Sequence, residues 1–177
     1  MSSELTIAGF GGQGVLFAGK ILAYAGLLSN KEVSWLPSYG PEMRGGTAHI
    51  DVIISNTSIG SPIISRPNIL VAMNQPSLEK YENKVQKDGL IIIDSSIIQL
   101  KVKRVDVKVC YIPATRLVSD AGLKGLANMV MVGKISREVK AFDLNTLRLA
   151  VTKSIPERRK ALLEPNLKAI DIGYNYL

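Results

Sequence analysis

The chain has 177 residues, 46% of them hydrophobic and 21% charged, a composition typical of one globular domain spanning residues 1–177. Its net charge of +7 is compatible with nucleic acid, a phosphorylated ligand or an acidic partner chain. The basic residues are scattered, and their densest set, Arg158, Arg159 and Lys160, lacks interleaved aromatic residues. We therefore expect no nucleic-acid binding.

The chain contains one cysteine, Cys110, and one histidine, His49. A single cysteine excludes an internal disulfide and leaves no cysteine set for a zinc site or an iron–sulfur cluster within this chain. We expect no metal site here and any redox metal in another chain. Cys110 has no neighbour that would activate its thiol, so we interpret it as structural. His49 lies in an alternating run and is expected to face solvent or an interface.

An apolar stretch at residues 5–30 carries only one charge, that of Lys20. A glycine cluster and Gln13 interrupt this stretch, and no cationic segment precedes it. We expect neither a membrane span nor a signal peptide. The expected location is the cytoplasm.

The first predicted elements are a buried strand at residues 5–8 and a helix at residues 15–28. The turn between them reads Gly9-Phe10-Gly11-Gly12-Gln13-Gly14. Its glycine spacing matches G-x-G-x-x-G, in which missing β-carbons let a ligand's phosphates approach the backbone at the start of a helix. The alternative is that the glycines only let strand and helix pack closely. The ligand-binding candidates in this turn are Gly9, Gly11, Gly12, Gln13 and Gly14.

The second predicted strand, at residues 33–36, lacks a feature of dinucleotide sites. NAD and FAD sites carry an acidic residue at the end of this strand to hold a ribose hydroxyl. Here the strand runs into Pro37, and the nearest acid, Glu32, precedes it. The sequence thus argues against NAD and FAD and favours another phosphate-bearing ligand.

A loop at residues 38–47 follows, because Gly-Pro and Gly-Gly pairs break regular structure. A loop placed just after a strand of an α/β sheet is typical of a ligand site, and an arginine in it suits a carboxylate or phosphate. The alternative is a surface turn with an incidental ion pair. Four residues of this loop are predicted to contact substrate or a partner subunit: Tyr39, Glu42, Met43 and Arg44.

The remaining pattern alternates strands and helices. Asn74 is expected to cap a helix or contact a ligand, Gly125 and Gly133 are expected to let another helix approach closely, and the tail 165–177 is expected to dock on a surface. The alternation predicts a three-layer α/β/α sandwich with a largely parallel sheet and a Rossmann-like first turn. Strands are predicted at residues 48–55, 69–73, 89–94 and 105–111, and helices at 74–85, 121–139, 143–152 and 156–163.

Three segments together resemble the gamma subunit of 2-oxoacid:ferredoxin oxidoreductases, and the resemblance runs nearly end to end. They are the glycine-rich turn 9–15, the Ser-Tyr-Gly-Pro-Glu-Met-Arg-Gly-Gly run at 38–46, and the closing segment 166–174. Phe10, Tyr39 and Met43 look more like the 2-oxoglutarate branch than the pyruvate and branched-chain branches, which tend toward Phe-Gly-Pro-Glu-Arg-Arg-Gly.

The resemblance implies a function and a set of partners. Such enzymes convert a 2-oxoacid and coenzyme A to an acyl-CoA and carbon dioxide while reducing ferredoxin. Thiamine diphosphate, Mg and the iron–sulfur clusters would lie in alpha, beta and delta-type partner subunits, and this chain would be inactive alone. Related single-chain enzymes place a similar turn near coenzyme A, with a lysine that matches Lys20. The alternative, based on the glycine spacing alone, is a stand-alone Rossmann-like nucleotide-binding oxidoreductase.

Overall fold

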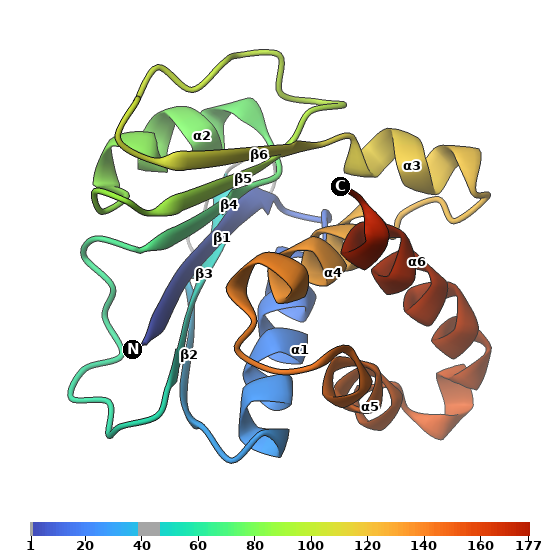
Figure 1. Cartoon of the computed structure of the whole chain (residues 1–177). Coiled ribbons are helices and arrows are strands. Elements are labelled where there is room, and N and C mark those ends of the chain that lie inside the picture. Colours follow the sequence, from blue (N-terminus) through green and yellow to red (C-terminus); the bar gives the residue numbers. More distant parts are fainter. Residues whose placement is uncertain (1, 39–46) are drawn as a thin grey trace.

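The computed structural model describes residues 2–38 and 47–177. Predictions made for Tyr39, Glu42, Met43 and Arg44 lie outside the described residues. Six strands form one sheet in the order β2-β3-β1-β4-β5-β6 (Figure 1). These strands are β1 (Ser3–Phe10), β2 (Glu32–Ser38), β3 (Thr47–Ser55), β4 (Ile69–Ala72), β5 (Leu90–Asp94) and β6 (Lys108–Ile112).

The sheet is mixed and mostly parallel. β1, β4, β5 and β6 pair in parallel, whereas β3 runs antiparallel to both of its neighbours, β1 and β2. The connection from β2 to β3, residues 39–46, is shorter than the crossover of about a dozen residues that parallel neighbours require. The prediction of a largely parallel sheet is confirmed with β3 as its exception.

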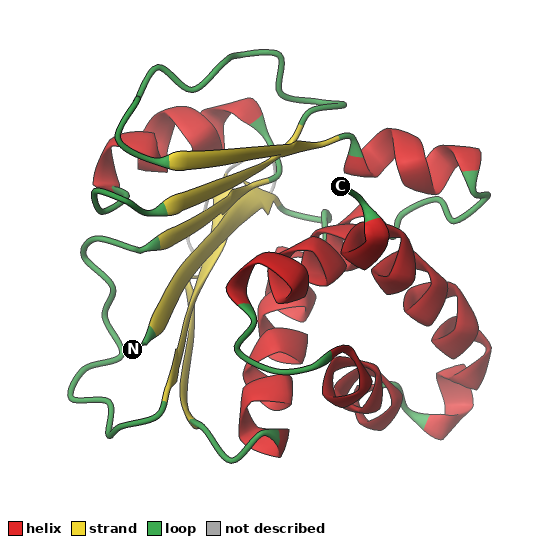
Figure 2. Cartoon of the chain, viewed as in Figure 1, coloured by secondary structure: helices red, strands yellow, loops and turns green. Residues whose placement is uncertain are grey.

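The helices flank the sheet unequally. α1, α4, α5 and α6 lie on one face, and α2 lies on the other (Figures 1 and 2). The α-helices are α1 (Val15–Leu28), α2 (Gln75–Tyr81), α3 (Ala114–Asp120), α4 (Ala127–Val139), α5 (Leu144–Ser154) and α6 (Leu163–Asn175), and the 3-10 helices are η2 (Glu82–Lys84) and η3 (Glu157–Leu162).

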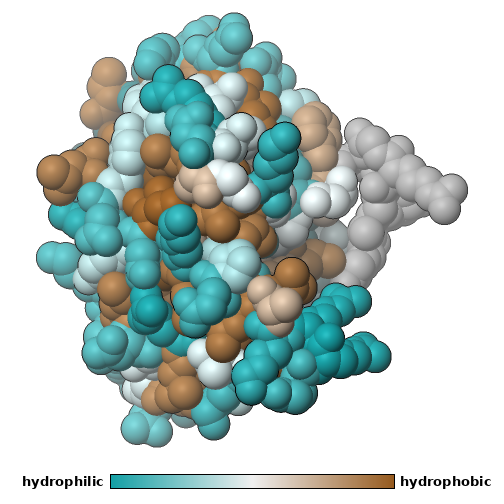
Figure 3. Space-filling view, turned by 90° about the vertical axis from the view of Figure 1, so that its right-hand side faces the viewer, coloured by the Kyte–Doolittle hydropathy of each residue, from teal (hydrophilic) through white to brown (hydrophobic). Residues whose placement is uncertain are grey.

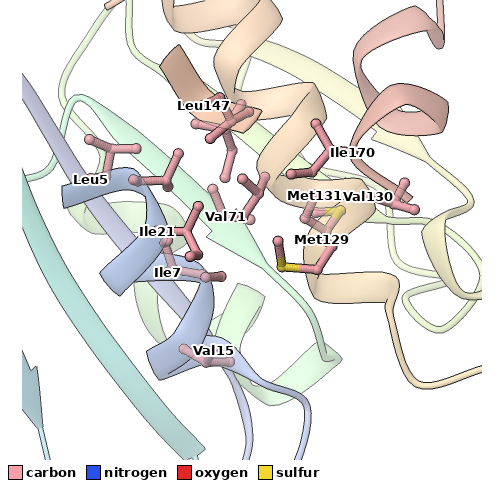
Figure 4. Packing of buried hydrophobic residues seen from close by; sticks show 14 of the residues in the cluster. Leu5, Ile7, Val15, Ile21, Val71, Met129, Val130, Met131, Leu147 and Ile170 are labelled. Atoms are coloured by element: carbon pink, nitrogen blue, oxygen red, sulfur yellow. The ribbon is translucent and has the colours of Figure 1, made fainter. Parts of the chain in front are cut away.

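The main core lies between the sheet and the larger set of helices. Because side chains alternate along a strand, Leu5 and Ile7 of β1 both point to this face and are fully buried. They meet Ile21 of α1 and Leu147 of α5 in one cluster, which Met129 of α4 joins (Figure 4). Thr6 and Ala8 point to the other face, where α2 covers a smaller cluster.

α4 and α6 cross at very close range through two glycines. A β-carbon on Gly133 would meet the backbone oxygen of Ile170, and one on Gly173 would meet that of Val130. The predicted close approach at Gly133 is confirmed. Gly125 instead lies in a turn with φ +85°, and no atom of the described residues lies within 4 Å of an added β-carbon, so the prediction for Gly125 was wrong.

The C-terminal segment docks on the molecule, as expected, but as a helix. Lys134 and Arg137 of α4 donate hydrogen bonds to the carbonyl oxygens of Tyr176 and Tyr174, at 3.0 and 2.9 Å. Two charged side chains thereby satisfy backbone acceptors at the end of α6, where a helix leaves its last carbonyls unpaired.

Three predicted elements were wrong in type or extent. Residues 105–107 precede β6 instead of belonging to it, and Val105 is fully exposed. Residues 121–126 form a turn because Gly122 and Gly125 both adopt positive φ, which ends α3 before α4 begins. The predicted helix 156–163 is largely the 3-10 helix η3. Across the described residues, every helix is too short or too polar to cross a bilayer.

Candidate functional site

The glycine-rich turn joins the end of β1 to the start of α1, as predicted. Gly12 and Gly14 have φ of +98° and +74°, in the left-handed region that side chains with a β-carbon disfavour. Gly14 is the residue immediately before the first turn of α1. The chain therefore reverses here by a backbone path that requires glycine at two positions.

The Gln13 side chain stabilises the turn through two hydrogen bonds. Its side-chain oxygen accepts a hydrogen bond from the Phe10 amide at 2.6 Å, and its side-chain nitrogen donates to the carbonyl of Met73 at 2.9 Å. A β-carbon on Gly9 would lie 2.6 Å from that same Gln13 oxygen and 3.0 Å from the Met73 β-carbon. Gly9 and Gln13 thus have packing roles in the turn, as the alternative interpretation holds.

Asn128 of α4 supports the turn from the opposite side. Its side-chain nitrogen donates to the Gly14 carbonyl at 3.2 Å, and a β-carbon on Gly14 would meet the Asn128 side chain. The Asn128 side-chain oxygen is buried and has no hydrogen-bond partner in the described part of the chain. Sequence reasoning missed this residue, although a buried asparagine in an otherwise apolar helix start is a recognisable signal.

Gly12 differs from its neighbours in the turn. Among the described residues, no atom lies within 4 Å of a β-carbon added there, and both Gly11 and Gly12 are exposed. Close packing within this part of the chain therefore gives no reason for Gly12 to lack a side chain.

The start of α1 has backbone amides without an acceptor inside the helix. The first helical bond from residues after the turn is donated by Ala18 to the Gly14 carbonyl, at 3.0 Å. The amides that precede Ala18 in α1 have no acceptor one turn back. The helix has no side-chain cap and no acidic residue in its first turn. This end of α1 is suited to an anion.

A pocket of about 380 Å³ adjoins the turn. It lies beyond the carboxyl end of β4, under α3 and the turn that leads to α4. Most of its lining is apolar, and Lys124 is the one cation among the described residues that line it. The lining residues are Gly12, Gln13, Met73, Ile97, Thr115, Val118, Ser119, Lys124, Gly125 and Ala127.

A buried carboxylate fixes the wall of this pocket. Asp94, fully buried at the end of β5, accepts hydrogen bonds from the Thr115 hydroxyl at 2.6 Å and the Ser96 amide at 3.1 Å. Asp94 therefore positions the start of α3 and is not free for a ligand.

Asn74 caps α2 by accepting from the Ser77 amide at 2.8 Å, which confirms the capping prediction.

The structure does not bring Lys20 to this pocket. Lys20 is exposed on α1 and is absent from the described residues that line the pocket. Its part in ligand binding stays a prediction.

Two features argue against a dinucleotide site. The neighbours of β1 in the sheet are β4 and the antiparallel β3, so β2 is one strand removed from the glycine-rich turn. β2 itself ends at Ser38, without the acid that would hold a ribose.

Among the described residues no group of three or more His, Cys, Asp or Glu side chains could hold a metal ion. With one cysteine in the sequence, the donor set does not fit an iron–sulfur cluster.

Comparison with known proteins gives one consistent family. The model of the family described as pyruvate ferredoxin/flavodoxin oxidoreductase matches residues 4–176. The 2-oxoglutarate synthase subunit KorC of Methanocaldococcus jannaschii is 37% identical over 177 residues, covering 98% of this chain and 93% of that protein.

Two solved structures share the fold. The gamma subunit of a keto/oxoacid ferredoxin oxidoreductase from Geobacter sulfurreducens has a TM-score of 0.84 at 26% identity, covering 97% of this chain and 96% of that one. The 2-oxoglutarate:ferredoxin oxidoreductase of Magnetococcus marinus, with 2-oxoglutarate, coenzyme A and succinyl-CoA bound, has a TM-score of 0.84 at 22% identity. This chain spans 30% of that longer one. The likeness extends over nearly the whole chain, well beyond the glycine-rich turn.

Proposed function

This chain is a gamma subunit of the pyruvate ferredoxin/flavodoxin oxidoreductase family, and we propose that the complex it serves acts on 2-oxoglutarate. The name of the Methanocaldococcus jannaschii relative, 37% identical along nearly its whole length, supports this substrate. The proposed reaction converts 2-oxoglutarate and coenzyme A to succinyl-CoA and carbon dioxide, and two electrons pass to ferredoxin.

The proposed contribution of this chain is to bind the phosphates of coenzyme A. The observation that carries the proposal is Gly12, whose missing β-carbon leaves open space beside a 380 Å³ pocket at an uncapped helix start. The amide groups at the start of α1 supply donors for phosphate oxygens. Lys124 supplies a positive charge at the pocket's rim, and the apolar lining suits the uncharged arm of the ligand.

The proposed division of labour leaves the redox chemistry to partner chains. Thiamine diphosphate with Mg would supply the carbanion-stabilising chemistry, and iron–sulfur clusters would carry the electrons. The resemblance to the family implies that these groups lie in alpha, beta and delta-type subunits, and the single cysteine of this chain agrees with iron–sulfur clusters held elsewhere. The longer Magnetococcus marinus chain, of which this chain spans 30%, supports a close association between this module and the rest of the enzyme.

The surface offers apolar area for such partners. Over the face that carries α3 and α6, hydrophobic residues gather toward the middle and are interrupted by hydrophilic ones (Figure 3). Leu149 and Leu162 are 45% and 49% exposed, on the helices and 3-10 segment remote from the sheet. Exposed apolar side chains grouped on one face are typical of subunit contacts.

The test is recovery of the native complex with this chain as the tagged component, followed by an assay of viologen-dye reduction. We expect co-purifying thiamine-binding and iron–sulfur chains, and activity that requires both coenzyme A and 2-oxoglutarate. Faster turnover of pyruvate or a branched-chain 2-oxoacid would contradict the proposed substrate and leave the subunit role standing. Oxidation of a 2-oxoacid by this chain alone would contradict the division of labour.

A further inference from the structure

A second pocket lies on the face of the sheet opposite α1. It has a volume of about 240 Å³ and is lined by β1, β3, the segment 64–67 before β4 and the α2–η2 segment. It has no lining residue in common with the pocket at the glycine-rich turn. Its polar and titratable lining residues are Thr6, His49, Asp51, Ser65, Lys80, Tyr81 and Lys84.

Three of these side chains lie next to one another on the sheet. Thr6 of β1 is the register partner of Asp51 of β3, and His49 is two residues from Asp51 on the same face. The Thr6 hydroxyl donates to the Asp51 carboxylate at 2.7 Å. Thr6 is buried, and His49 and Asp51 are half-buried. Polar groups on an otherwise apolar sheet face lose solvation on folding, so their concentration here calls for a role.

Two ammonium groups stand over the same pocket. The side-chain nitrogens of Lys80 and Lys84 lie 5.4 and 5.2 Å from the centre of the Tyr81 ring. The His49 ring is packed against the same ring at 5.4 Å, tilted by 50°. Among the described residues, neither lysine forms an ion pair. Both lysines are exposed, their ammonium groups lie near the same ring that packs against His49, and this ring attracts them without neutralising their charge.

The charges around the pocket do not balance. Burial lowers the pKa of His49 and the two lysines lower it further, against the opposing effect of Asp51. Burial raises the pKa of Tyr81 to about 12, with a smaller contribution from Asp51. At neutral pH the histidine and tyrosine are therefore uncharged, and two positive lysines face one carboxylate. Burial also raises the pKa of Asp51, so the carboxylate too is held away from its preferred solvated state.

We propose that this pocket binds a small oxyanion, a carboxylate or a phosphate group, held between Lys80, Lys84 and His49. The ligand supplies the negative charge that the two ammonium groups lack, and His49 donates a ring N–H to it. The volume is below the roughly 300 Å³ at which sites for drug-sized ligands begin, so the ligand is a single anionic group or a small molecule. Asp51 lines the same pocket and favours the protonated form of His49, as the bound anion also does.

His49 is the only histidine in the chain, so its ring signals in an NMR spectrum are unambiguous. We would titrate the full chain with inorganic phosphate, with succinate and with sodium chloride as a control for ionic strength, recording the His49 ring shifts from pH 5 to pH 9. We expect a saturable shift with phosphate or succinate and a rise in the His49 pKa in the bound state. The probe that saturates identifies the class of anion.

Variants separate this pocket from general charge effects. Replacing both lysines (Lys80→Gln with Lys84→Gln) should raise the dissociation constant about tenfold or more, as expected for lost charge-assisted hydrogen bonds. The matched control, Lys153→Gln with Lys168→Gln, removes the same charge from exposed positions on α5 and α6 and should leave binding unchanged.

Two results would overturn the proposal: shifts that never saturate with either anion, or equal weakening in the two double variants. The variants are compared only after their amide spectra show the native fold. If the Lys80 and Lys84 double variant does not fold, the single substitutions replace it, and unchanged binding in both would also overturn the proposal.

Discussion

At the scale of single residues, Gly12 gives the sharpest test of ligand approach to the glycine-rich turn. We expect Gly12→Val to raise the KM for coenzyme A in the assembled enzyme, because the new side chain would fill open space beside the pocket. Steady-state kinetics with coenzyme A as the varied substrate measures this effect.

The control for Gly12→Val is Gly122→Val. Gly122 also has a positive φ, +70°, and no atom of the described residues lies within 4 Å of an added β-carbon, but Gly122 does not line the pocket. Both substitutions strain the backbone by about 1–3 kcal/mol, so only a ligand effect distinguishes them. An unchanged KM in the Gly12 variant would restrict this turn to a packing role.

Gly14 and Asn128 form a pair whose coupling can be measured. Gly14→Ala should destabilise the fold by more than the backbone strain of about 1–3 kcal/mol, because the methyl group meets the Asn128 side chain. In an Asn128→Ala background that steric part should disappear. A double-mutant cycle by urea denaturation tests this, and additive effects would contradict the contact.

These residues mark how much of the candidate site the sequence could predict. The glycine spacing located the turn, the strand before it and the helix after it, since all three follow from local pattern. The contact between Asn128 and Gly14 could not be predicted, because the two residues lie 114 positions apart along the chain. Nor could the separate roles of Gly9 and Gly12 be distinguished, since only their surroundings in the fold differ.

At the scale of elements, the α4–α6 crossing depends on Gly133 and Gly173. Alanine at either position would place a methyl group against a backbone carbonyl of the other helix, which cannot move aside as a side chain can. We expect each substitution to cost about 3 kcal/mol or more, at or above the usual range for overpacking. Gly60→Ala, with nothing within 4 Å, should change the free energy of unfolding little. Equal stability of all three variants would contradict the close crossing.

Glu138 connects α4 to β6 and makes the stability depend on pH. It pairs with Lys108 at 2.6 Å and with the buried Lys134 at 2.9 Å. Burial alone would raise the pKa of Glu138, but hydrogen bonds from both lysines outweigh it and lower the pKa. A depressed folded-state pKa stabilises the fold above the unfolded value, near 4, and that contribution is lost as the pH falls further.

We therefore expect Glu138→Gln to lose about 3 kcal/mol at pH 7, with the difference from wild type shrinking as the pH falls below about 4. Urea denaturation at several pH values measures this. Glu157→Gln is the control. The side chains of Glu157 and its ion-pair partner Lys160 are 84% and 69% exposed, and such exposed pairs contribute little to stability. A difference that stays constant with pH would show that the carboxylate charge is not responsible.

The elements differ in how well local pattern predicts them. α1 was predicted with its observed bounds because its apolar run ends sharply at both ends. The alternation at 105–107 predicted strand, but the residue before this segment, Arg104, donates instead to the carbonyls of Glu82 and Val85, at 3.0 and 2.6 Å. Such contacts, about twenty residues away in sequence, override a local β pattern.

At the scale of the whole molecule, the main core depends on the helices that pack on one face of the sheet, α1, α4, α5 and α6. Removal of residues 163–177 would delete Leu167 and Ile170 from the core and uncover the surfaces of α4 and α5 against which α6 packs. We expect this truncation to lose cooperative melting and to bind the dye ANS while keeping much of its far-UV circular dichroism. Deletion of Leu177 alone, which is 96% exposed, is the control. A sharp melting transition in the long truncation would contradict a shared core.

The overall topology was only partly accessible from sequence. Buried strands that alternate with helices indicated a mostly parallel sheet, and the described strands bear this out. The insertion of β3 between β1 and β2 could not be deduced from periodicity, since a strand's apolar pattern does not reveal its neighbours. The length of the 39–46 connection was the available signal for an antiparallel pair.

The spread of the main cluster along the chain has a consequence for folding during synthesis. The cluster draws on residues from Leu5 to Ile170, and a ribosome adds about 5–20 residues per second. The apolar face of α1 therefore stays uncovered until α4, α5 and α6 have been made and have docked. During that interval its exposed apolar surface is open to non-native association.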